Sequence, residues 1–408
     1  MYWAKGNVPW TLVWSHSSAS EVEKLSMMKA SPGMDAPIYE PKVLMTPRNE
    51  ENPYLGNLMN ALVEQGIDVD FFEMNPTSSQ TLNAFLVPFL LIKERISGAG
   101  ILHIHWVYQF AMPSLIGFKL TASIPRLWFG FCLQWARLFG FRIVATIHDV
   151  VPLVQVFDDD DRARRTLIKY ADSVIAITDQ ARLDIARRFN TDLRSIHSIP
   201  EGAPVIPSAI GSQKSRAELG LDSRPLIVLA GRQNPYKGAD LLLEACGRLP
   251  AKLNVQVVVA GAAADLVYAD KIRKCVANLQ NANRHATWLE GSYTERTYDL
   301  LLSAANVVAI PFRWITNSTT VRQAMARGVL VVIPNLPALA DIPMDGCVRF
   351  ESTDSDGLTL ALERSLNMSN GERRHMIHTA RQWATAWSWN RVAEETAEIY
   401  REVLHEDH

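Results

Sequence analysis

The sequence predicts an α/β protein with two doubly wound parallel sheets, each in its own lobe. Short apolar runs alternate with amphipathic segments along the chain, which is typical of parallel strands covered by helices. The 408 residues exceed what one hydrophobic core usually contains. Proline, glycine and serine accumulate near residues 200–215, and the alternation begins again after this stretch. We interpret the stretch as a linker between two Rossmann-like lobes.

Periodicity defines the elements of the first lobe. A helix over 57–66 should end at Gly66. In the helix expected over 81–98, Pro88 should disturb the hydrogen-bond ladder, because proline has no N–H. Residues 1–40 show no periodicity and are expected to be irregular. The strands expected in this lobe are residues 42–46, 67–73, 100–106, 141–149 and 173–178.

The second lobe repeats the pattern. Its expected strands are residues 225–231, 254–261, 306–312 and 329–334, and its expected helices are 238–249, 297–305 and 321–328. A last amphipathic helix is expected over 391–404. The predicted boundaries are an irregular segment over 1–40, an N-terminal lobe over 41–204, a linker over 205–222, a C-terminal lobe over 223–385 and a terminal helix region over 386–408.

Composition excludes several classes of protein. The formal net charge of -2 argues against a protein that binds nucleic acid through its charge. Four scattered cysteines form no C-x-x-C pair, which indicates reduced thiols rather than a disulfide framework or a zinc site. The N-terminus lacks the pattern of a signal peptide, and no apolar run is long enough to span a bilayer. We therefore expect a cytoplasmic protein.

The sharpest chemical signal is the stretch LIVLAGRQNPYKGADLLLEA, residues 226–245. A buried strand should end at Gly231, and the loop after it carries Arg232 and Lys237. Ligands of open α/β sheets bind at the carboxyl ends of strands, and two cations there suit a diphosphate. Considered alone, two solvated surface cations are the more common explanation for such a pair.

A second signal is TNSTT, residues 316–320, between an expected strand and an expected helix. Small polar side chains at this point can cap the free N–H groups of the first helical turn. The same helix N-terminus can also bind a phosphate. Without further context, capping is the simpler explanation.

The order of these motifs resembles the GT-B glycosyltransferases. The motif GR-x4-KG is followed by VVVAG, LEGSYTERTYDLLLSA and PFR…MARGVLVVIP, as in the large retaining group that includes many bacterial exopolysaccharide enzymes. The resemblance covers residues 42–405 and is strongest over 226–335. It implies an acceptor-binding N-terminal lobe, a C-terminal lobe that binds a nucleotide sugar, and a last helix that packs back on the N-terminal lobe.

The resemblance also implies a donor site in which Arg232 and Lys237 neutralise the leaving diphosphate, so that no metal or other cofactor is required. The implied donor-binding residues are Gly231, Arg232, Lys237, Tyr293, Arg313, Asn317, Ser318, Thr319, Thr320 and Gln323.

The chain departs from the group at one motif. The family often has Glu-x7-Glu in the strand-to-helix stretch, but this chain has Ile315 and Gln323 at the two glutamate positions. A subset of the family has a turn rich in threonine, asparagine and serine there, similar to TNSTT. In this context we favour anion binding over capping alone. The resemblance leaves open whether the reaction retains or inverts the anomeric configuration.

Candidate residues in the N-terminal lobe lie at strand ends. His148 and Asp149 follow an expected strand, and the resemblance places such a histidine near the reacting carbon, as a base or as a hydrogen-bond donor. A histidine that merely caps the strand is an equal alternative. His103 and His105 share one face of a strand, but no third metal ligand is evident. The acceptor-binding candidates are Asn52, Tyr54, His105 and Trp106.

Residues 125–142 combine aromatic side chains with arginines. Trp128, Phe131, Trp135, Leu138 and Phe139 recur at helical spacing, flanked by Arg126, Arg137 and Arg142. The stripe suits an interfacial membrane helix. A helix that buries the stripe in the core is the slightly favoured alternative.

The predicted function is transfer of a hexose from a UDP- or GDP-sugar to a saccharide acceptor without a metal. The expected acceptor is a lipid-linked oligosaccharide of a bacterial exopolysaccharide or cell-surface glycan, at the inner face of the membrane. Two alternatives remain: a GT-B epimerase of nucleotide sugars, and an inactive GT-B scaffold.

Overall fold

A computed structural model describes most of the chain beyond residue 40. The predicted irregular segment 1–40 and the site candidates Asn52, Asn317 and Ser318 lie outside the described residues. The described residues are 41–47, 53–74, 80–106, 123–150, 155–204, 206, 211–315, 319–351 and 355–405.

Two six-stranded sheets, both with parallel pairing throughout, confirm the predicted fold class. The first sheet has the order β2-β1-β3-β4-β5-β6. The chain therefore changes direction across the sheet between β1 and β3. Its strands are β1 (Lys42–Thr46), β2 (Val69–Phe71), β3 (Ala99–Ile104), β4 (Arg142–Ile147), β5 (Ser173–Ala176) and β6 (Ile196–Ser198).

The second sheet has the order β12-β11-β10-β7-β8-β9, so its direction changes between β7 and β10. In doubly wound sheets, ligands bind beside the carboxyl ends of the two strands at such a switch point. Its strands are β7 (Leu226–Ala230), β8 (Gln256–Ala260), β9 (His285–Leu289), β10 (Val307–Ala309), β11 (Leu330–Pro334) and β12 (Val348–Phe350).

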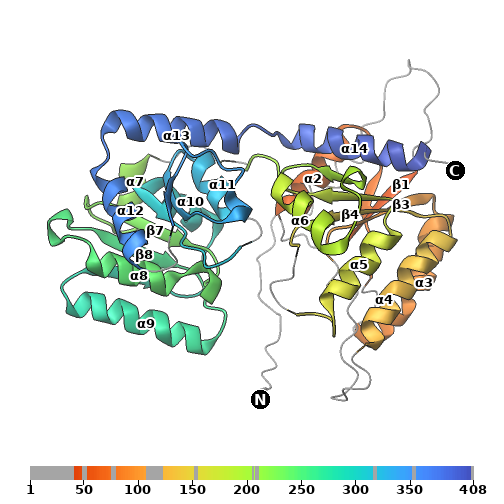
Figure 1. The fold of residues 1–408 in the computed structure, drawn as a ribbon, viewed down its shortest axis with the longest axis horizontal. Coiled ribbons are helices and arrows are strands. Elements are labelled where there is room, and N and C mark those ends of the chain that lie inside the picture. Colours follow the sequence, from red (N-terminus) through yellow and green to blue (C-terminus); the bar gives the residue numbers. More distant parts are fainter. Residues whose placement is uncertain are drawn as a thin grey trace. The chain divides into compact units, whose positions relative to one another are not determined.

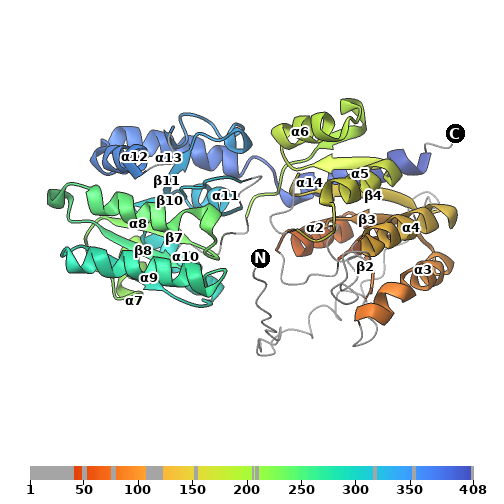
Figure 2. The ribbon, with the colours of Figure 1, turned by 60° about the horizontal axis from the view of Figure 1, so that its bottom comes forward.

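Helices cover both faces of each sheet (Figures 1 and 2). On the first sheet, α3, α4 and α5 form one layer, and α2 and α14 form the other. The helices are α2 (Pro53–Glu64), α3 (Gln80–Ile96), α4 (Ile124–Leu138), α5 (Asp160–Tyr170), α6 (Asp179–Phe189), α7 (Ser212–Glu218), α8 (Ala239–Arg248), α9 (Leu266–Asn281), α10 (Glu295–Ala304), α11 (Thr319–Ala326), α12 (Ser355–Asn367), α13 (Asn370–Ala384) and α14 (Trp389–His405).

The last helix, α14, belongs to the core of the first sheet. Its buried face includes Val392, Ala397 and Tyr400, which pack in one cluster with residues of β1 and α2. The Tyr400 hydroxyl also lies 2.6 Å from Nδ1 of His103 on β3. The chain end therefore contributes both apolar contacts and a buried hydrogen bond to this sheet.

Helix α3 runs through Pro88 without a break, contrary to the expected disturbance. A proline at position 88 leaves the carbonyl of Ala84, one turn earlier, without its helical N–H donor. The indole N–H of Trp128 on α4 donates to this carbonyl at 2.9 Å. A side chain from the neighbouring helix thus replaces the hydrogen bond that proline cannot make.

The favoured interpretation of the aromatic stripe on α4 holds only in part, because Trp128 is half-buried against the core whereas Phe131 and Leu138 are exposed. The core side of the helix is formed by Phe129, Cys132, Leu133 and Ala136. The stripe lies on the other side as a ladder of ring contacts from Phe85 of α3 through Trp128, Phe131 and Trp135 to Phe139. The helix carries large side chains on both sides, so sequence spacing could not tell which side is buried.

The arginines beside the stripe hold α4 to its neighbours. Arg126 makes a two-point contact with the Asp158 carboxylate, at 2.8 and 3.2 Å. Arg137 and Arg142 both reach Asp172, at 3.0 and 3.4 Å. These cations therefore already have carboxylate partners. In the part of the chain that the structure describes, no helix is both long and apolar enough to cross a bilayer.

The two tryptophans of α4 provide a matched pair of stability predictions. Trp128→Phe should destabilise the fold by about 1–2 kcal/mol, because it leaves the part-buried Ala84 carbonyl without a protein donor. Trp135→Phe should be close to neutral, since the indole N–H of Trp135 is buried and has no partner among the described residues. Urea denaturation of both variants measures the difference. Equal loss of stability in the two variants would mean that the hydrogen bond from Trp128 to the Ala84 carbonyl contributes nothing.

Candidate active site

The loop after β7 places an ammonium group over a glycine. Gly231 has φ +111°, and a Cβ built there would lie 2.4 Å from Nζ of Lys237 and 4.0 Å from Oγ1 of Thr320. Gly238 has φ +74°, and a Cβ there would meet the Pro311 carbonyl oxygen at 2.3 Å. Both glycines are therefore required. They let Nζ of Lys237 and the Thr320 hydroxyl of α11 both approach Gly231, at the switch point between β7 and β10.

Lys237 is buried, and burial lowers its pKa to about 8. No carboxylate or other hydrogen-bond acceptor contacts its ammonium group within the described residues. A buried cation without a counter-ion is unfavourable, and an anionic ligand would relieve the cost. Arg232, on the same loop, is exposed.

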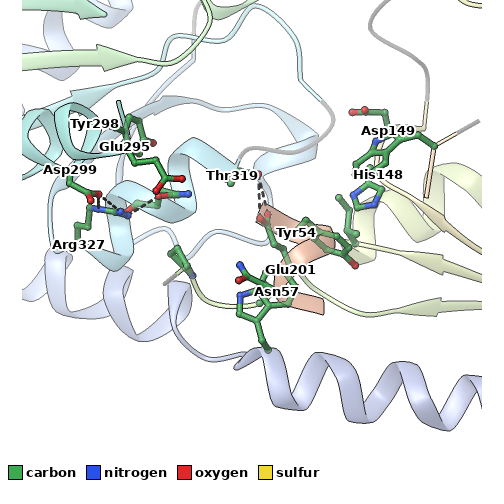
Figure 3. Close-up of a pocket in the computed structure, with 16 residues that line it drawn as sticks. Tyr54, Asn57, His148, Asp149, Glu201, Glu295, Tyr298, Asp299, Thr319 and Arg327 are labelled. Carbon is green, nitrogen blue, oxygen red and sulfur yellow. Dashed lines mark hydrogen bonds and ion pairs between the residues drawn. The ribbon is translucent and has the colours of Figure 1, made fainter. Parts of the chain in front are cut away.

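A protein carboxylate lies at the beginning of α11. The hydroxyl of Thr319, the first residue of the helix, donates to the two carboxylate oxygens of Glu201 at 3.2 and 3.4 Å (Figure 3). The next residue, Thr320, lies close to Gly231 and to the Tyr298 hydroxyl. The helix start is therefore shared between an anion of the protein on one side and the Lys237 loop on the other.

Gln323, at one of the two positions where the family often has glutamate, is already engaged. Its side-chain oxygen accepts a hydrogen bond from Nη1 of Arg327 at 2.8 Å. Arg327 also pairs with the Asp299 carboxylate, with Nε at 3.1 Å (Figure 3). The neutral amide thus binds an arginine, and its NH₂ group is the part of the side chain that can donate to a ligand.

One predicted donor residue is engaged elsewhere in the protein. Arg313 binds Asp240 with both terminal nitrogens, at 2.9 and 2.8 Å, and also the Pro235 carbonyl. Burial opposes ionisation of Asp240, but hydrogen bonds from Arg313, Lys271 and Tyr268 hold its pKa down at about 2. This clamp ties the Lys237 loop to α8. Arg313 therefore supports the loop, and we leave it out of the donor site.

Tyr293 lies beside the loop that carries Gly231 and Lys237. Its ring stacks on Tyr298 at 6.2 Å. Burial raises the pKa of its hydroxyl, partly offset by a hydrogen bond with the Gly231 backbone. Tyr293 therefore stays a candidate for contact with the donor.

A cavity of about 610 Å³ brings together most of the other candidates (Figure 3). Neither Arg232 nor Lys237 is among its described lining residues. The walls carry four carboxylates and four aromatic side chains besides His148, with Arg327 as the cation. The predicted residues that line it are Tyr54, Trp106, His148, Asp149, Thr319 and Gln323.

His148 is held at the edge of the cavity by rings. It stacks on Trp106 with centroids 4.3 Å apart, and the edge contact with Tyr54 has centroids at 4.6 Å. Its Nε2 lies 3.3 Å from Nδ1 of His105. Burial lowers the pKa of His148 to about 3. The histidine is therefore neutral near pH 7 and supplies one N–H and one lone pair.

His103 has a structural role. Its ring nitrogens contact the Tyr400 and Thr146 hydroxyls at 2.6 and 2.8 Å. Across the described residues, no group of three or more His, Cys, Asp or Glu side chains is arranged to hold a metal ion. His103 is therefore explained by hydrogen bonding in the core.

Several residues of the cavity were missed by the sequence reasoning. Glu201 follows β6 in the predicted linker region, where no pattern distinguishes it from a solvated surface residue. The glycine after it, Gly202, was a weak signal of close packing at this point. In the structure a Cβ at Gly202 would lie 2.5 Å from the Trp389 ring, so only glycine fits. The missed residues with polar or aromatic side chains are Asn57, Glu201, Glu295, Tyr298, Asp299, Arg327 and Trp389.

Comparison with known sequences agrees with this geometry. The family described as Glycosyl transferases group 1 matches residues 211–383, less than half of the chain. The alpha-maltose-1-phosphate synthase of Mycobacterium tuberculosis (strain CDC 1551 / Oshkosh) is 30% identical over 258 residues, covering 59% of this chain and 65% of that protein. A D-inositol 3-phosphate glycosyltransferase of Xylanimonas cellulosilytica is 27% identical over 246 residues, 58% of each chain. The chain thus spans less than two thirds of the length of both relatives.

Solved structures agree over nearly the whole chain. A sucrose-phosphate synthase from Thermosynechococcus elongatus superposes with a TM-score of 0.67 at 19% identity, covering 90% of this chain and all of that one. The fold is GT-B. Another GT-B neighbour is Anabaena HepE in complex with UDP-glucose, with a TM-score of 0.65 at 15% identity over 89% of this chain. At these identities the likeness concerns the GT-B fold alone.

Proposed function

We propose that this GT-B chain transfers a hexose from a UDP- or GDP-sugar to a saccharide acceptor. The observation that carries the proposal is the buried Lys237 ammonium, which lies at the second sheet's switch point and lacks a counter-ion among the described residues. A leaving diphosphate is the ligand whose charge would compensate it, and stabilising that charge accelerates transfer. The names of the group 1 relatives support the same reaction type.

The charge distribution separates the diphosphate from the sugars. The cavity holds four carboxylates, Asp149, Glu201, Glu295 and Asp299, so a diphosphate among them would be repelled. We therefore place the diphosphate at Lys237, Arg232, Thr320 and the backbone of α11. In this proposal the two cations of the loop after β7 supply the charge that a metal would otherwise bring.

The cavity itself suits a polyhydroxylated ligand. Carboxylates accept hydrogen bonds from hydroxyl groups, and aromatic rings cover the apolar C–H faces of a sugar. Tyr54, Trp106 and Trp389 supply rings, whereas Asp149 and Glu201 supply acceptors. We place the transferred hexose and the reacting part of the acceptor here, with His148 beside the reacting carbon.

The first experiment is a thermal-shift screen of the full chain against UDP, GDP, ADP and dTDP. A nucleotide at 100 times its dissociation constant should add ~2.7 kcal/mol of stability. The corresponding sugar nucleotide is then incubated with and without saccharide acceptors, and products are separated by mass spectrometry. Conversion of the donor alone to an epimer would establish the epimerase alternative. If none of the four nucleotides raises the melting temperature, the inactive scaffold is favoured.

The acceptor is proposed to be lipid-linked because of one apolar surface. Leu82, Phe85, Phe89 and Ile96 on α3 and Ile124, Leu127, Phe131 and Leu138 on α4 are all exposed. We call these eight side chains the α3–α4 surface. The two helices touch through Phe85 and Trp128. An exposed surface of this kind suits the boundary between headgroups and acyl chains. The enzyme would then act at the cytoplasmic face of a membrane.

Phe89→Ser with Phe131→Ser should reduce sedimentation of the protein with vesicles of phosphatidylcholine and phosphatidylglycerol, because the variant removes two exposed rings from the α3–α4 surface. The matched control is Leu266→Ser with Val267→Ser, which removes two exposed apolar side chains from α9. Nucleotide binding should be unchanged in both. Equal sedimentation of both variants, or a wild type that does not sediment, would point to a soluble sugar phosphate as acceptor, as the names of the two relatives suggest.

A further inference from the structure

One hydrogen bond joins the neighbouring side chains of His105 and His148. Nδ1 of His105 and Nε2 of His148 lie 3.3 Å apart. Burial lowers the pKa of both side chains, that of His148 to about 3, so both rings are neutral near pH 7. A neutral imidazole has one N–H and one acceptor nitrogen. One of the two facing nitrogens therefore donates, and the other accepts.

The second nitrogen of His105 decides the direction. Its Nε2 is buried and has no hydrogen-bond partner among the described residues. If the hydrogen of His105 were on Nε2, a buried N–H would have no acceptor, whereas the other tautomer leaves only a lone pair there. Buried N–H groups without an acceptor are the rarer and more costly case. His105 therefore carries its hydrogen on Nδ1 and donates it to His148.

The two rings of the pair are packed against other rings. The His105 ring lies 4.1 Å from the His103 ring, whose two nitrogens are occupied by Tyr400 and Thr146. His148 is stacked on Trp106. With Nε2 as the acceptor from His105, the hydrogen of His148 is on Nδ1. That nitrogen is the one that remains for a ligand in the cavity.

We propose that His105 is a positioning residue that fixes His148 as the Nδ1–H tautomer, so that His148 donates a hydrogen bond to an oxygen atom of the bound ligand. The nature of that oxygen rests on the proposed function: a sugar hydroxyl, or the oxygen that joins the hexose to the diphosphate. In this state His148 cannot remove a proton from an acceptor hydroxyl, because its accepting nitrogen is occupied. This decides between the two roles left open by the sequence.

The direct test measures the tautomer without substrate. The full chain is labelled with ¹⁵N-histidine, and the ring of His148 is identified by comparison with His148→Gln. Long-range ¹H–¹⁵N correlation should show a protonated Nδ1 and an unprotonated Nε2. A protonated Nε2 would overturn the proposal. This readout does not depend on catalysis, whereas failure of the wild type to bind any nucleotide would overturn only the proposed function.

Two variants extend the test. In His105→Asn, the amide nitrogen can take the place of Nδ1 and donate to His148, so the tautomer and most of the turnover should be kept. In His105→Leu the donor is lost, the tautomers of His148 should mix, and kcat should fall by roughly tenfold, which corresponds to one hydrogen bond. Nucleotide affinity and the circular dichroism spectrum should stay as in the wild type. Equal kcat in the asparagine and leucine variants, with both folded, would show that His105 does not set the state of His148.

Discussion

Lys237→Met should abolish detectable sugar transfer and weaken binding of the donor's nucleoside diphosphate by roughly 10- to 100-fold. A charge-assisted hydrogen bond to a buried group contributes about 1.5–3 kcal/mol. Lys237 is the buried cation of the loop, so water screens it less than an exposed cation. Arg232→Ala should have a smaller effect, because Arg232 is exposed. Calorimetric titration of each variant with UDP and GDP gives the affinities.

The same variant should make the ligand-free protein more stable. Burial lowers the pKa of Lys237 from 10.5 to about 8, so between these two values the unfolded chain binds more protons than the folded one. The free energy of unfolding therefore rises as pH increases through this window, and below it the buried charge costs on the order of 3 kcal/mol. Methionine removes this cost.

Both parts of the prediction can be checked with one control. Lys252→Met removes an exposed lysine and should change neither binding nor stability. In the wild type, affinity for the diphosphate should fall as pH rises through about 8, because the free ammonium loses its proton there. Wild-type affinity in Lys237→Met would remove Lys237 from the donor site. A melting temperature below that of the wild type would show that the ammonium group has a stabilising partner.

Thr319→Glu should abolish binding of the diphosphate, whereas Thr319→Ala should lose only about 1 kcal/mol, as for a lost helix cap. If backbone N–H groups at the start of α11 hold the phosphates, a single hydroxyl adds little. A carboxylate at position 319 would instead occupy the place of the anion and repel it in the cleft. Calorimetry with the preferred nucleotide compares the two variants, with circular dichroism as the check on folding.

Glu201 requires a second variant in this test. Its carboxylate already accepts from the Thr319 hydroxyl at 3.2 Å, so a glutamate at 319 would also repel Glu201. Thr319→Glu combined with Glu201→Gln removes this repulsion. If the double variant still does not bind, position 319 faces the anion site. Recovery of binding in the double variant would mean that Thr319→Glu lost affinity through repulsion from Glu201. Equal affinity of Thr319→Glu and Thr319→Ala would mean that residues 316–320 only cap the helix.

The sequence by itself determined the two parallel sheets. Strands of such sheets are buried on both faces, so they are continuous apolar runs, and 226–230 and 330–334 are recognisable without any contact map. It also indicated the Gly231 and Lys237 loop, because a glycine and a lysine at this spacing after a strand are local features. The match to group 1 glycosyl transferases, over residues 211–383, includes this loop.

Tertiary structure alone decided which side chains meet. Strand order sets the switch points, and the sequence does not contain it, so the cavity could not be assembled from motifs. Glu201 faces Thr319 from 118 positions away. The indole N–H of Trp128 on α4 donates to the Ala84 carbonyl that Pro88 leaves without a helical donor on α3. Local patterns fix backbone conformation, whereas buried hydrogen bonds and charges find partners that are distant in sequence, and these partners define the site.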